Sequence, residues 1–266
     1  MRIATKATDA IVATTDKRQE VKDFGRDLGI VVLDGNFLQK LTTSDTLSEQ
    51  RISEEEFFEK INDYELNKLD GDWKGRIKYC KSLLAKPLSF DTCNEWLLNA
   101  KFFIEQAITK ENQKEIALRC LYLLCSFTAI AIDYCMREIS FYETTERSRL
   151  IKEGCTYGAR GSSGIKKVLN LAMGLVEENA LDGTVISKQV RKNIEFELSK
   201  LNTVSLGEYF SKNEVARSLF SVAKEFEQLA MNKSFVSHAK GSSELRSMLF
   251  CFIDYWEIDR QMLSGK

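Results

Sequence analysis

The sequence is poor in the residues that break helices and in those that build metal sites. A single proline occurs in 266 residues. Because proline interrupts helix interiors, its scarcity favours long helices and excludes a proline-rich linker. His238 is the only histidine, and the seven cysteines contain no Cys-x-x-Cys pair, so a zinc site built from Cys and His is not expected. The odd number of cysteines, several in apolar runs, and the lack of a signal peptide predict free thiols and a cytoplasmic location.

The sequence also lacks a long hydrophobic run and an excess of charge of either sign. The most apolar stretch is Cys120–Ile132, which is shorter than the roughly 20 residues a membrane-spanning helix needs. It predicts a buried core helix and no membrane contact. The formal net charge is −1, so the chain as a whole does not attract polyanions, and any contact with nucleic acid must come from a local basic patch.

The first forty residues have the pattern of a small α/β unit. Residues 10–14 (AIVAT) form a short apolar run, KRQEVKDFGRDLG has the period of a helix, and GIVVLDG is a second apolar run. Strand, helix and strand at this spacing predict a βαβ unit with two parallel strands, followed by a short helix, NFLQKL. Parallel strands need further strands beside them and cover on both faces, and nothing downstream resembles the rest of such a sheet.

From residue 53 onward the pattern is helical. Ser53 and Glu56 form a capping-box signal at the start of SEEEFFEKINDYEL. Further helices are expected over 73–85, 90–108, 112–142, 144–153, 163–178, 185–201, 213–232 and 242–262. The predicted fold is therefore mainly α, with a small N-terminal βαβ remnant of two parallel strands (domain 1–42) followed by a multi-helix bundle (domain 53–266). The segment 43–52 (TTSDTLSEQR) is the expected junction.

The N-terminal unit resembles a known nuclease family. The stretch ATKATDAIVATTDKRQEVKDFGRDLGIVVLDGNFLQKL, residues 4–41, is similar to the C-terminal end of restriction-endonuclease-like domains of the Mrr type, the PD-(D/E)xK nucleases. In that family a strand ending in Val/Ala-Thr-Thr precedes a helix, a Gly-Ile strand and an Asp-Gly before a short apolar helix. The corresponding residues here are Ile11–Thr15, Gly29–Leu33, Asp34-Gly35 and Phe37-Leu38.

The resemblance implies an ancestry rather than an activity. The family cleaves phosphodiesters with Mg²⁺ held by an aspartate and a Glu-x-Lys on adjacent strands, and those strands precede the segment preserved here. The chain is therefore expected to be a fragment or truncated relative, or to have its missing half supplied by a partner. It is expected to have a role in nucleic-acid processing or defence, with no catalytic residues, metal or cofactor in this form.

The same unit offers an alternative metal site. Asp9 followed by Glu20 and Lys22 has the spacing of the family's catalytic motif, but the chemistry needs both carboxylates on neighbouring strands. Glu20 and Lys22 lie in a helix-periodic segment, where residues i and i+2 point apart. A solvated helix face is the preferred interpretation.

The strongest binding candidate in the helical part is a basic segment rich in glycine, 147–167. A Gly/Ser loop leading into a helix offers free backbone N–H groups to a phosphate, and arginines with a tyrosine suit a nucleic-acid backbone or single strand. The alternative is an ordinary connecting loop with Ser163 as the helix cap. The candidate nucleic-acid or phosphate-binding residues are Arg147, Arg149, Lys152, Tyr157, Arg160, Ser163, Lys166 and Lys167.

Three further features of the sequence have a structural interpretation. The octapeptide 159–166 (ARGSSGIK) resembles 239–246 (AKGSSELR), which we interpret as a repeated way of starting a helix. A second basic run, Lys188, Arg191 and Lys192, is interpreted as a solvated helix face because glutamates follow it. His238 is expected to have a surface or capping role.

Two functions are compatible with these features. In the first, the protein associates with DNA or RNA through the segment 147–167. In the second, it is a helical interaction or regulatory module without a nucleic-acid role, whose partner is another protein or a second copy of the chain.

Overall fold

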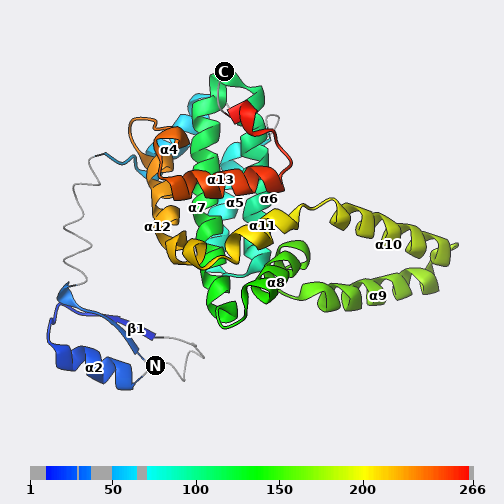
Figure 1. Ribbon diagram of the computed structural model, residues 1–266, viewed down its shortest axis with the longest axis horizontal. Coiled ribbons are helices and arrows are strands. Elements are labelled where there is room, and N and C mark those ends of the chain that lie inside the picture. The colour runs from blue at the N-terminus through cyan, green and yellow to red at the C-terminus, as the bar shows by residue number, and fades with distance from the viewer. Residues whose placement is uncertain (1–9, 29, 37–49, 65–70, 264–266) are drawn as a thin grey trace. The chain divides into compact units, whose positions relative to one another are not determined.

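A computed structural model describes residues 10–28, 30–36, 50–64 and 71–263. The chain divides into two compact units, Met1–Ile52 and Ser53–Lys266, which are described separately. The protein is mainly helical, with a two-stranded parallel sheet in the first unit, which confirms the predicted fold class (Figure 1).

The first unit is the predicted βαβ arrangement. It consists of β1 (Ala10–Ala13), α2 (Gln19–Asp27) and β2 (Ile30–Leu33). The strands pair in parallel, with Ala10 opposite Ile30 and Ala13 opposite Leu33. The helix covers one face of this pair at Gly25, where a Cβ would lie 2.2 Å from Cγ2 of Val32.

The other face of the pair is apolar and exposed. Ile11 and Val31 are register partners and remain 66% and 53% exposed among the described residues. Parallel strands are normally covered on both faces, whereas in the described residues only one face of this pair is covered by a helix. The short helix expected from Phe37 onward lies outside the described residues.

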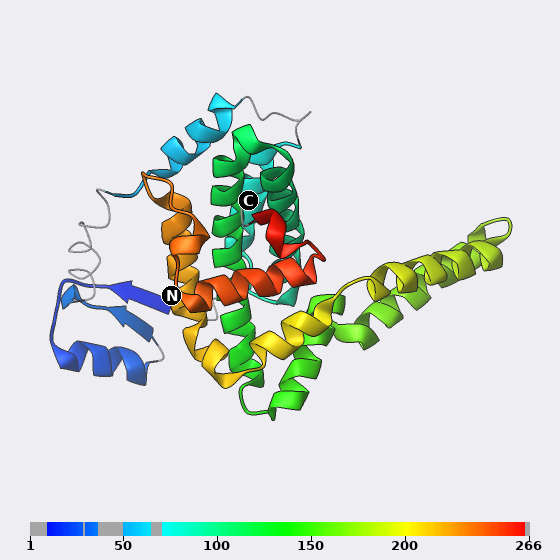
Figure 2. The same ribbon diagram turned by 45° about the horizontal axis from the view of Figure 1, so that its top comes forward.

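Three long helices form the core of the second unit. They are α6 (Phe90–Thr109), α7 (Lys114–Ile139) and α12 (Asn213–Met231), and both α6 and α12 pack extensively against α7, as Figures 1 and 2 show. By length and composition the segment Glu111–Ile139 could cross a membrane, but 89% of its most apolar window is buried within the protein. It therefore has the burial of a core helix, as predicted.

Shorter helices surround this core. They are α4 (Glu54–Asp63), α5 (Trp73–Ser82), α8 (Thr144–Tyr157), α11 (Thr203–Phe210) and α13 (Ser243–Tyr255). Two further helices, α9 (Gly161–Asn179) and α10 (Gly183–Ser199), pack against each other as an antiparallel hairpin. The hairpin extends away from the core helices beyond α8 (Figures 1 and 2).

The sequence located most helices but erred at three places. The capping box of Ser53 and Glu56 is present, and α6 and α12 lie within a residue of their predicted bounds. The helix predicted over 242–262 ends at Tyr255, because Glu257 adopts a left-handed φ of 57° that an α-helix cannot continue through. The short α11 was not predicted, and the break expected over 154–164 is much shorter than expected.

The expectation that His238 has a surface or capping role is wrong. Its side chain is buried, and its Nδ1 lies 2.7 Å from the hydroxyl of Tyr122 on α7. The Tyr122 hydroxyl also accepts a hydrogen bond from the His238 backbone N–H at 3.1 Å. Burial lowers the pKa of His238, so the neutral imidazole belongs to the folded state. The pair attaches the loop after α12 to the core.

Candidate functional site

The predicted binding segment folds as two helices joined by a tight turn. Helix α8 continues to Tyr157, and α9 begins at Gly161. Gly158 and Gly161 have φ values of 72° and 62°, which glycine adopts without the steric cost that a Cβ would bring. Gly158 and Gly161 therefore form a tight turn between helices, and the longer Gly/Ser loop predicted for this segment is wrong.

Arg147 belongs to the interior of the helical unit. It is 6% exposed, and its Nη2 donates to Oδ1 of Asn213 at 2.7 Å and to Oγ1 of Thr144 at 3.1 Å. These bonds join the start of α8 to the start of α12. Arg147 is therefore placed to stabilise the fold, and its guanidinium is not presented to a ligand.

Arg149 is neutralised by its own helix. Its guanidinium forms ion pairs with Glu146 at 2.7 Å and with Glu153 at 2.9 Å. The hydrogen bonds to Arg149 lower the pKa of Glu146, and the pKa of the arginine is raised in return. Both carboxylates are thus ionised at neutral pH, and Arg149 contributes little net positive field.

The N-terminus of α9 is already occupied by a carboxylate. Oε1 of Glu153 accepts the backbone N–H of Ser162 at 3.0 Å and its hydroxyl at 2.9 Å. The backbone hydrogen bond from Ser162 is the main cause of a lowered Glu153 pKa. A free phosphate would have to displace this group from the positive end of the helix dipole. The prediction that Ser163 caps the helix is wrong, since Arg160 occupies the N-cap position and Ser163 lies inside α9.

The first serine of the repeated octapeptide makes the same kind of hydrogen bonds in both copies. At the second site Glu225, on the preceding helix α12, accepts the backbone N–H of Ser242 at 2.7 Å and its hydroxyl at 2.5 Å. Both Gly-Ser-Ser sequences therefore start a helix whose first serine binds a glutamate of the helix before it. This confirms that the repeat is a way of starting a helix.

Three predicted cations remain exposed without an ion pair among the described residues. They are Arg160 in the turn and Lys166 and Lys167 in the second turn of α9. Lys152 is only partly exposed, and its Cγ would lie 2.5 Å from a Cβ built on Gly207 of α11. The cations that face solvent are therefore those at the base of the hairpin.

The fold adds a second set of cations that the sequence did not assign to this site. In the antiparallel hairpin, Nη1 of Arg191 on α10 donates to Oδ1 of Asn170 on α9 at 2.7 Å. Lys188, Arg191 and Lys192 recur at helical spacing and share one face of α10. The bond to Asn170 places this face beside the α9 segment that carries Lys166. Only the antiparallel register of the hairpin brings the two basic runs together, and a local pattern could not reveal it.

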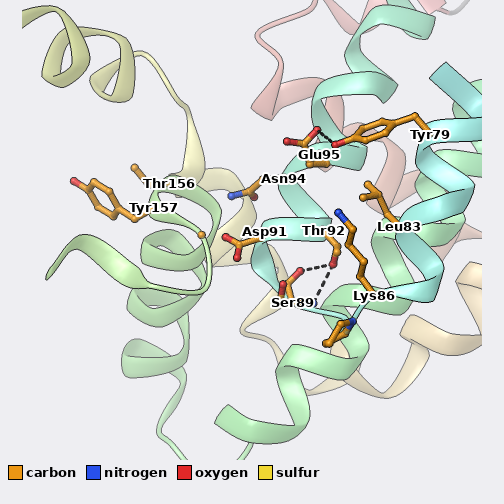
Figure 3. Close-up of a pocket in the computed structure, with 12 residues that line it drawn as sticks. Tyr79, Leu83, Lys86, Ser89, Asp91, Thr92, Asn94, Glu95, Thr156 and Tyr157 are labelled. Carbon is orange, nitrogen blue, oxygen red and sulfur yellow. Dashed lines mark hydrogen bonds between the residues drawn. The ribbon is translucent and has the colours of Figure 1, made fainter. Parts of the chain in front are cut away.

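Tyr157 borders a cleft of about 720 Å³ between α8 and the start of α6 (Figure 3). Asp91 and Glu95 of α6 line it together with Lys86. Oδ1 of Asp91 accepts the N–H of Ala159 at 2.9 Å, and Oε2 of Glu95 accepts the Tyr79 hydroxyl at 3.1 Å. With two carboxylates and one ammonium on its walls, this cleft is a poor site for a phosphate. Figure 3 also shows the Tyr157 ring directed away from the other labelled side chains.

The alternative metal site of the first unit is not assembled in the described residues. Glu20 and Lys22 lie on α2, as the periodicity predicted, and Asp9 lies outside the described residues. Lys22 forms an ion pair at 2.7 Å with Asp34, which is 2% exposed. Within the described ranges no group of three or more His, Cys, Asp and Glu side chains could hold a metal ion.

Comparison with known proteins adds no further assignment. No protein-family model, curated protein or solved structure matches the chain significantly. The interpretation of the site therefore rests on its own residues.

Proposed function

We propose that this protein associates with the sugar–phosphate backbone of DNA or RNA through the cations of the α9–α10 hairpin. The observation that carries the proposal is the set of exposed cations brought together there. Arg160, Lys166 and Lys167 come from the α8–α9 turn and the start of α9. Lys188 and Lys192 flank Arg191 on α10, which bonds to Asn170 in the middle of α9. We also propose that the protein is cytoplasmic, as its free, buried thiols suggest.

The chemistry of the patch suits phosphate contacts better than base recognition. Lysine ammonium groups act as point charges toward phosphates and do not read a base sequence. Their long side chains tolerate different backbone geometries, so binding is expected to be weakly selective. The proposal is consistent with descent from a restriction-endonuclease-like protein, and it involves no bond cleavage by this chain.

The test is salt-dependent binding to short duplex and single-stranded DNA and to RNA, followed by fluorescence anisotropy. Replacing Arg160, Lys166 and Lys192 with Ala should weaken binding and make the log–log dependence of affinity on salt less steep. Removing three phosphate contacts lowers that slope by about 2.7 for a duplex and by about 2 for a single strand.

A matched control removes the same charge from another exposed surface. Lys212, Arg217 and Lys224 are exposed residues at the start of α12 or within it, and replacing them with Ala should leave both affinity and salt slope unchanged. Absence of binding to either polymer at low salt, or equal losses in the two triple variants, would overturn the proposal.

A second candidate function, a protein–protein interaction module, is favoured by a separate observation. The hairpin exposes large apolar side chains on the side of α9 away from α10. Val168, Leu171 and Leu175 are 48%, 71% and 56% exposed. Water contact with such residues in a row is unfavourable, which indicates a partner on this side of the hairpin.

A further inference from the structure

The outer face of α9 carries an apolar stripe that its own unit does not cover. Val168, Leu171 and Leu175 recur at i, i+3 and i+7, so they lie on one face of the helix. The opposite face is directed toward α10, where Met173 is buried. A helix that is apolar on both faces is normally covered on both. Among the described residues, only the face of α9 that is directed toward α10 is covered.

The charges along the stripe are arranged in a self-complementary way. Lys167 precedes the stripe and Glu178 follows it. Both are exposed, and no ion pair to either is found among the described residues. They are eleven residues apart, and since three turns of helix take about 10.8 residues, they lie along the same edge of the stripe. In the sequence, the midpoint between Lys167 and Glu178 falls within one residue of the midpoint of the stripe, taken between Val168 and Leu175. The charges are therefore placed almost symmetrically about the centre of the stripe.

We infer that the stripe is the contact surface for a second copy of this chain, with the two α9 helices packed antiparallel about a twofold axis. An antiparallel pair brings the same edge of each stripe together. Lys167 of each copy then lies against Glu178 of the other, and the leucines interdigitate between these two ion pairs. Each α9 then lies between its own α10 and the α9 of the other copy, so both of its faces are covered.

Gly174 is consistent with a close approach of the two helices. It lies in the middle of α9, where glycine costs about 1 kcal/mol relative to alanine. Nothing lies within 4 Å of a Cβ built there, so no contact within the unit requires a glycine. It follows Lys167 by seven residues and therefore lies on the same edge of the stripe. A neighbouring helix could approach closely at this position.

The first experiment measures the oligomeric state of the full-length protein by sedimentation velocity over a micromolar range of concentration. We expect a reversible monomer–dimer equilibrium that Leu171→Ser weakens by about 100-fold or more, because each substitution removes two buried leucines per dimer. Leu98→Ser is the matched control. Leu98 of α6 is 66% exposed and lies outside the stripe, so its replacement should leave the dimer intact.

Charge exchange tests the antiparallel geometry itself. Lys167→Glu should weaken the dimer by placing like charges together, and Glu178→Lys should do the same. The double variant that carries both changes should restore association toward that of the wild type. All of these side chains are exposed, so circular dichroism melting curves should be nearly unchanged.

A protein that stays monomeric at every concentration would overturn the inference. So would a dimer that Leu171→Ser leaves intact, or a double charge variant no tighter than the single ones. Lys167 belongs to both proposed surfaces, so the two proposals are separated by variants that change only one of them. Leu171→Ser removes no cation, and the variant used to test nucleic-acid binding keeps Lys167 and the whole stripe. Loss of one property without the other would therefore identify which proposal fails.

Discussion

Arg119 is expected to be the most costly single charged side chain to remove. It lies on α7 with a fully buried side chain. Its Nη1 donates to the carbonyl of Ala230 at 3.0 Å and to that of Asn232 at 2.6 Å, and its Nη2 reaches the carbonyl of Lys233 at 3.4 Å. These carbonyls lie in the last turn of α12 and just after it, where the helix has no N–H donors left for them. The guanidinium thus serves as a cap supplied by another helix.

The expected magnitude follows from these bonds. Each of the two short hydrogen bonds from a charged donor contributes about 1.5–3 kcal/mol, and the long third bond adds little. The ion pair with Glu115, whose side chain is 47% exposed, is screened by water and is discounted. Arg119→Met keeps an unbranched apolar side chain but leaves the carbonyls unsatisfied. It should lower the free energy of unfolding by about 3–5 kcal/mol.

Arg137 provides the control in the same helix. It is 71% exposed and pairs with Asp133 at 2.8 Å across one helical turn. Arg137→Met makes the same chemical change and should cost no more than about 0.5 kcal/mol. Urea unfolding followed by circular dichroism measures both values. If the Arg119 variant were within about 1 kcal/mol of the wild type, the guanidinium would not be what stabilises the end of α12.

Three further predictions concern buried polar groups and thiols. Burial lowers the pKa of His238 below 6.5 in the folded state, so the unfolded chain binds the proton more readily and the free energy of unfolding should fall as pH drops below about 6.5. In His238→Gln this part of the pH dependence should be absent. Equal slopes of unfolding free energy against pH in the variant and the wild type would contradict the prediction. Glu225→Ala removes both hydrogen bonds from Ser242 and should lower the free energy of unfolding by about 1–2 kcal/mol, whereas an unchanged urea midpoint would show that the helix start does not depend on them. The seven cysteines are buried and free, and burial raises the pKa of Cys80 to about 12, so a thiol reagent should label none of them until the protein unfolds, and rapid labelling of the native protein would refute this.

The sequence was informative where structure is locally encoded. The Ser53 and Glu56 capping box marks the start of α4 because both of its hydrogen bonds are made within four residues. The apolar stretch beginning at Cys120 could be identified as a core helix because no charge interrupts it. By contrast, the eight-residue α11 is too short for a periodic pattern, and it depends on contacts with α8 and α13 that lie elsewhere in the chain.

The candidate binding site could be predicted only in part, because a sequence shows which residues are charged but not which of them form ion pairs or hydrogen bonds in the fold. In the sequence Arg147 and Arg149 look as available to a ligand as Arg160. In the structure Arg147 donates a hydrogen bond to Asn213, and Arg149 forms ion pairs with two glutamates. The acceptor Asn213 is 66 residues away from Arg147, which no local pattern can indicate. Pairing at long range therefore removed two of the predicted cations from the site.

Long-range contacts also add cations to the candidate site from another part of the chain. The basic run of α10 looked like an ordinary solvated helix face, since glutamates follow it in sequence. The hairpin turns this run back toward α9, where Arg191 bonds to Asn170, and the predicted patch gains Lys188 and Lys192. The outer face of α9, with its leucines, remains free for a different contact. The cations of the hairpin and the apolar stripe along α9, which share Lys167, can therefore serve two partners, a polyanion and a second copy of the chain.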